Sequence, residues 1–136
     1  TLKDVPRVVK ISIWCGIAKV KFIIICKKVD LVHTEGHGRN LKIIIITKSR
    51  FRNKRIQPID INFFMKYPYV AQMYIKIKIQ NPEKMYFYFI INNGGFKKYI
   101  LLDELYKTCE QAVFSGDTIE NIKEYREYSI DPHLIK

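Results

Sequence analysis

Two histidines and a carboxylate lie within five residues of this chain, in the segment His33-Thr34-Glu35-Gly36-His37. Zinc hydrolases place two histidines on one face of a helix, with a glutamate directly after the first, so that both imidazoles reach one metal ion. Glu35 stands in the wrong position for that role, and Gly36 and Gly38 favour a turn. We therefore expect a polar turn between the second and third strands, with no metal site and no cofactor.

His37 has a second role to consider, in acid–base chemistry on a phosphodiester, because Arg39 and Asn40 follow it closely. Such chemistry needs another titratable group beside the same phosphate, and sequence spacing supplies none. The glycine pairs at residues 36–38 and 94–95 also lack the lysine or helix start that phosphate-binding loops require. A small nuclease is therefore the third of three functional hypotheses.

Residues 48–55 contain five basic side chains and no acidic one. This density suits contact with phosphate groups, to which arginine donates two parallel hydrogen bonds. Four of the six arginines lie between residues 39 and 55, although the chain otherwise prefers lysine. We predict that this segment binds nucleic acid, and a solvated loop is the alternative. The predicted contact residues are Lys48, Arg50, Phe51, Arg52, Lys54 and Arg55.

Two segments of alternating polarity, residues 73–80 and 85–91, predict neighbouring strands with one apolar and one polar face. The glycine-rich break at residues 92–95 favours a tight hairpin into a third strand. Single-stranded nucleic acids bind such faces by stacking bases on aromatic rings while basic groups follow the backbone. The predicted face consists of Tyr74, Lys76, Lys78, Tyr86, Tyr88, Lys97 and Tyr99. Alternatively, helices or another subunit cover this face.

The first hundred residues read as strands, because β-branched and aromatic residues dominate six segments separated by Gly, Asn, Pro or charged breaks. The expected strands are residues 8–14, 18–29, 41–48, 70–80, 85–91 and 96–101. Residues 50–69 fit either a long connection or a short helix around residues 58–65. After residue 101 the apolar period is helical, which predicts one helix over residues 102–115 and a second over about 117–128.

The charge divides along the chain as the predicted structure does. Residues 1–100 contain 20 Lys and Arg against 5 Asp and Glu, whereas residues 101–136 contain 4 against 8. We predict one α+β domain over residues 1–136, with a basic β-rich part (1–101), an acidic helical part (102–128) and an irregular tail (129–136). Its core is a mostly antiparallel, twisted sheet of five to seven strands, packed by one or two C-terminal helices.

The three cysteines, Cys15, Cys26 and Cys109, are an odd number without a close pair. They predict reduced thiols and a location in the cytoplasm or nucleus. No apolar run approaches the roughly 18 residues that a membrane span needs. A fragment of a larger protein is one interpretation of a chain that begins at Thr1.

The net charge of +11 favours a polyanionic partner, although the codon usage of an AT-rich genome would also enrich lysine. The leading hypothesis is a non-enzymatic protein that binds RNA or single-stranded DNA with low sequence specificity. The runner-up is a protein–protein interaction module, a homo-oligomer or a subunit of an assembly. In that case strands pair edge to edge or bury a face, and the acidic C-terminal helix meets a basic partner.

Overall fold

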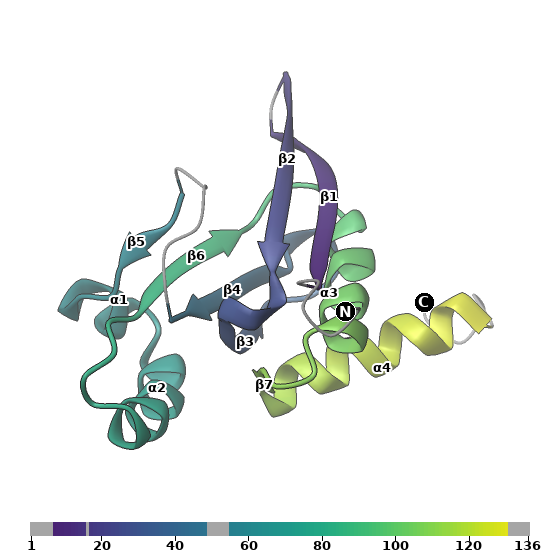
Figure 1. Ribbon diagram of the computed structural model, residues 1–136. Coiled ribbons are helices and arrows are strands. Elements are labelled where there is room, and N and C mark those ends of the chain that lie inside the picture. The colour runs from purple at the N-terminus through teal and green to yellow at the C-terminus, as the bar shows by residue number, and fades with distance from the viewer. Residues whose placement is uncertain (1–6, 16, 49–54, 131–136) are drawn as a thin grey trace, which may run out of the picture.

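The computed structural model describes residues 7–15, 17–48 and 55–130. A five-stranded sheet with the order β5-β6-β4-β3-β7 forms its centre (Figure 1). Neighbouring strands are antiparallel, except for β3 and β7, which are parallel. The strands are β3 (Val29–Glu35), β4 (Lys42–Thr47), β5 (Gln57–Pro58), β6 (Phe87–Ile91) and β7 (Val113–Phe114).

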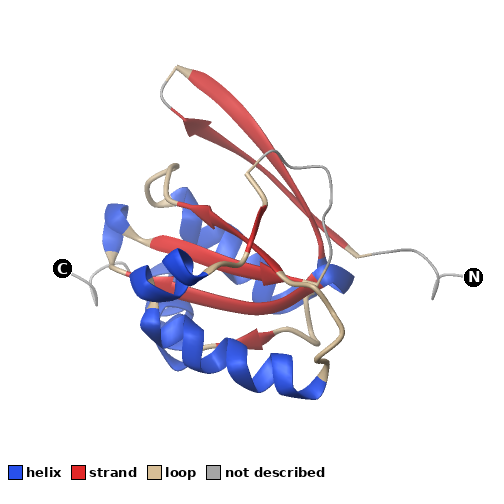
Figure 2. Cartoon of the chain, turned by 90° about the vertical axis from the view of Figure 1, so that its left-hand side faces the viewer, coloured by secondary structure: helices blue, strands red, loops and turns tan. Residues whose placement is uncertain are grey.

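The first two strands, β1 (Val8–Cys15) and β2 (Ala18–Ile25), form a separate antiparallel hairpin that we call the arm. The arm projects from the sheet in both views (Figures 1 and 2). Its apolar face is anchored in the core by Val9, Phe22 and Ile24. A short 3-10 turn (Cys26–Lys28) then leads the chain from the arm into β3. The strand expected over residues 18–29 is therefore two strands with a bend between them.

Helices cover both faces of the sheet. On one face, α3 (Lys97–Thr108), α4 (Gly116–Ile130) and the base of the arm enclose the larger hydrophobic core. On the other, α1 (Ile61–Lys66) and α2 (Pro68–Gln80) enclose a smaller, aromatic-rich core. All four isoleucines of residues 43–46 are completely buried, because β4 has a core on each side. The predicted α+β class, the mostly antiparallel sheet and the C-terminal helices are confirmed.

The prediction of a strand over residues 70–80 is wrong, since these residues form most of α2. Pro68 occupies the first helical position, where its fixed φ and missing N–H are tolerated. Val70, Met73, Tyr74 and Ile77 pack into the smaller core at the spacing of a helix. The apolar residues of this segment thus fit both the two-residue period of a strand and the 3.6-residue period of a helix. Burial against the sheet selects the helix.

The prediction of a strand over residues 96–101 is also wrong. Gly94 and Gly95 have positive φ and form a turn, but this turn leads from β6 into α3. The helix expected over residues 102–115 therefore begins at Lys97 and ends at Thr108. The short helix expected around residues 58–65 is α1, whose first turn is capped by a hydrogen bond from the Phe63 amide to Asp60.

The prediction of reduced cysteines fails for Cys26 and Cys109, which form a disulfide. Cys26 lies directly after the arm and Cys109 directly after α3, so folding brings together two residues that are 83 positions apart. Sequence spacing gave no sign of this pairing. The bond ties the base of the arm to the larger core.

Candidate functional site: a basic arm and a polar pocket

The predicted tyrosine and lysine face does not exist as one surface of a sheet. Tyr74, Lys76 and Lys78 lie on α2, and Lys97 and Tyr99 lie on α3. The strand β6 carries Tyr88, but helices cover both faces of the sheet in which it lies. The structure therefore separates these residues instead of gathering them.

The tyrosines of that predicted face belong to the core and its borders. Tyr86 and Tyr99 are buried, and burial raises the pKa of both hydroxyls. The Tyr88 ring lies 4.0 Å from the Phe63 ring, and its hydroxyl donates to Gln57 Oε1. The Tyr74 ring packs against Tyr86. Buried rings cannot stack on bases, so these tyrosines do not form the predicted base-stacking face.

The ends of the basic segment lie beside the arm. The Lys48 amide donates to the Lys28 carbonyl, and Lys48 Nζ lies 3.2 Å from Asp30 Oδ1. The Arg55 guanidinium lies over the Phe22 ring of β2. The remaining predicted contacts, Arg50, Phe51, Arg52 and Lys54, lie outside the described residues.

Three lysines are exposed on the arm: Lys10, Lys19 and Lys21. Residue pairing across the hairpin sets Ser12 opposite Lys21 and Lys10 opposite Ile23. Because side chains alternate across a strand, these lysines lie on the face opposite the buried Val9, Phe22 and Ile24. The arm thus has an apolar face toward the core and a basic face toward solvent.

Three contacts fix the base of the arm to the end of α3 and the turn after it. They are the Cys26–Cys109 disulfide, a hydrogen bond from Gln111 Nε2 to the Cys26 carbonyl, and an exposed ion pair between Arg7 and Glu110. Sequence reasoning identified none of these contacts, because each joins residues more than 80 positions apart.

A pocket of about 400 Å³ opens where β3 ends. Three elements contribute to it: β3 with its following turn, the first turns of α4, and Tyr69 of α2. Its lining residues are His33, Thr34, Glu35, Gly36, His37, Tyr69, Asp117, Glu120 and Asn121. The segment from His33 to His37 was expected to be a turn, but His33, Thr34 and Glu35 lie within β3 and only the residues after them turn.

The turn that carries His37 is held by α3. Lys98 Nζ is buried and donates to the Arg39 carbonyl, while the Gly38 amide donates to the Tyr99 hydroxyl. Gly36 adopts a φ of +80°, and a Cβ there would lie 2.8 Å from the Asn40 carbonyl oxygen. Only glycine fits this position, so the turn has a single defined shape.

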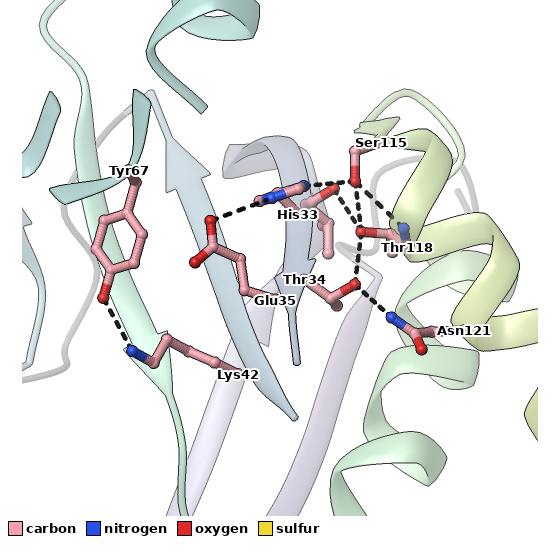
Figure 3. Close-up of polar contacts among 9 residues, drawn as sticks. His33, Thr34, Glu35, Lys42, Tyr67, Ser115, Thr118 and Asn121 are labelled. Carbon is pink, nitrogen blue, oxygen red and sulfur yellow. Dashed lines mark hydrogen bonds and ion pairs between the residues drawn. The ribbon is translucent and has the colours of Figure 1, made fainter. Parts of the chain in front are cut away.

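At the pocket, a chain of hydrogen bonds joins His33 to His37 through α4, and Figure 3 shows the part of it from His33 to Asn121. Ser115 lies at its centre, directly before α4, and accepts the Thr118 amide as the helix N-cap. The contacts are His33 Nδ1 to Ser115 Oγ (2.7 Å), Ser115 Oγ to Thr118 Oγ1 (2.7 Å), Thr118 Oγ1 to Thr34 Oγ1 (3.3 Å), Thr34 Oγ1 to Asn121 Nδ2 (2.9 Å) and Asn121 Oδ1 to His37 Nδ1 (3.2 Å).

The groups at its two ends determine the donor-to-acceptor direction of this chain of hydrogen bonds. The Glu35 carboxylate can only accept, so the His33 Nε2 that faces it at 3.6 Å carries the proton and Nδ1 accepts from Ser115. At the other end, the Asn121 carbonyl oxygen can only accept, so His37 Nδ1 donates to it. His33 stays neutral in this arrangement, because burial lowers its pKa although Glu35 and Asp117 act to raise it.

The sequence analysis singled out the β3 side of this pocket, residues 33–37, but not the residues of α4 that complete it. These are Asp117, Glu120 and Asn121. Within the described residues, no three His, Cys, Asp or Glu side chains are placed to hold a metal ion. No described helix has the length and apolar surface to cross a membrane.

No family model, curated protein or solved structure matches this chain. Its function is therefore argued from these two features, the arm and the pocket.

Proposed function

We propose that the protein binds nucleic acid, without catalysing a reaction, through the arm and the basic segment of residues 48–55. The observation that carries this proposal is the charge of the arm and its flanks. Residues 7–28 contain six basic side chains and no Asp or Glu. They are Arg7, Lys10, Lys19, Lys21, Lys27 and Lys28. Such a one-sided field attracts phosphate groups irrespective of base sequence.

The shape of the arm supports the same proposal. Two strands of eight residues extend over about 27 Å, and a two-stranded ribbon is narrow enough to enter a nucleic-acid groove. Lys10, Lys19 and Lys21 are exposed on its outer face. A basic side chain at alternate positions follows a phosphate backbone without requiring an aromatic platform.

The two described ends of the basic segment, Lys48 and Arg55, lie beside the arm. Lys48 is hydrogen-bonded to Lys28 at the base of the arm, and Arg55 lies over Phe22 within it. Because Phe22 lies on the face opposite the arm lysines, Arg55 adds positive charge beside the arm and not on the lysine face itself.

The proposal keeps RNA or single-stranded DNA as the partner, bound with low sequence specificity. The tyrosines predicted to stack on bases pack within the fold, so the expected contact is electrostatic, between basic side chains and phosphate groups. Phosphate contacts carry little base information, so related sequences are expected to bind alike. Duplex DNA belongs in the same test, because the arm has the dimensions of a groove-binding ribbon.

Fluorescence anisotropy with labelled RNA, single-stranded DNA and duplex DNA tests the proposal. The arm variant replaces Lys10, Lys19 and Lys21 with alanine, and a matched control replaces Lys76, Lys84 and Lys123, which are exposed elsewhere. Each lost phosphate contact lowers the slope of log K against log salt by about 0.7 for a single strand, so the arm variant should lose about two units. The control should retain the slope. Equal losses in both variants would show that net charge alone drives binding.

Exposed apolar side chains favour the alternative of a protein–protein interaction module. Ile61 and Met65 are exposed one turn apart on α1, and Ile75 and Ile79 are exposed one turn apart on α2. Large apolar side chains that repeat on the outer face of a helix are typical of interaction surfaces. Sedimentation of the purified chain over a range of concentrations separates this alternative from the leading proposal.

One feature of the pocket supports the third hypothesis, a small nuclease, and another opposes it. The structure places His33 and His37 in the same pocket. The same pocket is lined by Glu35, Asp117 and Glu120, whose charges repel a phosphodiester. The pocket therefore does not favour this hypothesis.

We expected an intracellular location, in the cytoplasm or nucleus, partly because the cysteines were expected to be reduced. The Cys26–Cys109 disulfide does not support that location, since disulfides persist mainly in oxidising compartments. Nucleic-acid binding by the arm does not depend on the compartment.

A further inference from the structure

The pocket at the end of β3 plays no part in the proposed nucleic-acid contact, and its construction indicates a second site. Five of the six residues in the hydrogen-bonded chain are buried: His33, Thr34, Ser115, Thr118 and Asn121. Burying polar side chains lowers stability unless every one is satisfied. Acidic side chains at the start of a helix would not by themselves define a site. Here they line a cavity together with an aromatic ring and buried polar side chains.

The lining residues determine which groups a ligand can contact. His37 Nδ1 donates to Asn121, which leaves His37 Nε2 available to a ligand. Glu35, Asp117 and Glu120 contribute carboxylates, which only accept. Tyr69 adds a hydroxyl, which can donate or accept, and the buried His33 Nε2 faces Glu35. A ligand that pairs with the three carboxylates must supply hydrogen-bond donors.

The charge and shape of the pocket further restrict the class of ligand that it can bind. Three carboxylates line the pocket while His33 stays neutral, so this small region is negative within a chain of net charge +11. Tyr69 also lines the pocket; its side chain is half exposed and its ring stacks on His33 at a centroid distance of 5.0 Å. An aromatic ring together with carboxylates suits a planar cation, which stacks on the ring and donates at its edge.

We propose that the pocket binds a guanidinium group, carried either by a small molecule or by an arginine side chain of a polypeptide. The planar fork of a guanidinium donates to Glu35 and to one α4 carboxylate at once, while its face lies on Tyr69. A volume of about 400 Å³ accommodates such a group with its aliphatic stem. Asn121 and Thr34 position the His37 ring, which lines the same pocket.

An NMR titration of the 15N-labelled protein with argininamide tests this proposal. Citrullinamide is the matched control, because its urea group has the shape of guanidinium without the charge. We expect saturable shifts centred on residues 33–37 and on Asn121, with argininamide binding at least tenfold more tightly than citrullinamide. Equal affinity for both, or shifts spread over all acidic residues without saturation, would overturn the proposal.

Two variants and one control locate the binding within the pocket. Glu35→Gln and Glu120→Gln should each weaken argininamide binding at least tenfold, whereas Glu127→Gln, which alters an exposed α4 carboxylate outside the pocket, should leave it unchanged. An equal loss in all three variants would contradict a specific site. Unchanged backbone spectra of each free variant establish that it is folded.

A short peptide with a central arginine distinguishes the two sources of the group. Affinity within threefold of that of argininamide identifies a polypeptide side chain as the ligand, and loss of binding identifies a small molecule. Nucleic-acid binding by the arm should be unchanged in Glu35→Gln, so failure of this inference and failure of the proposed function are separate results.

Discussion

The Cys26–Cys109 disulfide closes most of the chain into one loop, and removing it should have a large effect on stability. The perturbation is the double replacement Cys26→Ala and Cys109→Ala. Both side chains are buried and alanine is tolerated in a core, so the change mainly releases the loop. Cys15→Ala is the matched control, because it removes the third cysteine and leaves the bond intact.

The magnitude follows from the length of the loop. The two cysteines are 83 positions apart, and closing a loop of that size restricts the unfolded chain by about 4.5 kcal/mol at 25 °C. Small domains have total unfolding free energies of about 5–15 kcal/mol, so the bond accounts for a substantial share. With a urea dependence of about 1.5–2 kcal/mol per molar, the midpoint should fall by about 2–3 M.

Urea unfolding of the wild type, the double variant and the control measures this effect under oxidising conditions. Intact mass of the wild type before and after reduction reports whether the bond is present. An unchanged midpoint in the double variant, or three titratable thiols in the folded wild type, would refute the reasoning. The base of the arm would then be held by packing and hydrogen bonds alone.

Two further predictions test the core and the buried histidine. Phe89→Ala should lower the unfolding free energy by about 3–5 kcal/mol and Tyr88→Ala by about 2 kcal/mol, because both faces of β6 are covered. Chemical denaturation of the two variants checks this. A loss of stability confined to Phe89→Ala would indicate that the Tyr88 face of β6 is open. Because burial lowers the pKa of His33, the unfolded chain takes up a proton near pH 6.5 that the folded chain does not. The free energy of unfolding should therefore fall below that pH by at most about 1.4 kcal/mol per pH unit and level off below the folded-state pKa. Denaturation of the wild type and His33→Gln between pH 7 and 5 checks this, and equal pH dependence in both proteins would exclude His33 as the source.

Sequence patterns predicted the strands well where a β-branched run was bounded by clear breaks. The arm strands and β4 and β6 lie close to where their β-branched runs placed them. The isoleucines of residues 43–46 carried a signal that we did not use: an unbroken apolar run in a strand indicates burial on both faces. That run predicts helices on both sides of the sheet, and it contradicts an open tyrosine face.

The segment that became α2 shows why the remaining fold was not predictable from local pattern. Its isoleucines at alternate positions fit a strand, while Val70, Met73, Tyr74 and Ile77 fit a helix. The choice depends on a sheet surface built by residues far away in sequence. The pocket has the same origin, because its two halves are more than 80 positions apart and meet only when α4 packs against β3.

The most direct test of the central claim is to map the nucleic-acid contact on the folded protein. The 15N-labelled chain is titrated with a short single-stranded oligonucleotide at low salt, and amide shifts are followed residue by residue. We predict that the largest shifts fall in the arm, at Lys10, Lys19 and Lys21 and their neighbours, and at Lys48 and Arg55, and that added salt reverses them. Shifts centred on α2, or no shifts in the arm at a concentration where anisotropy reports binding, would contradict the account.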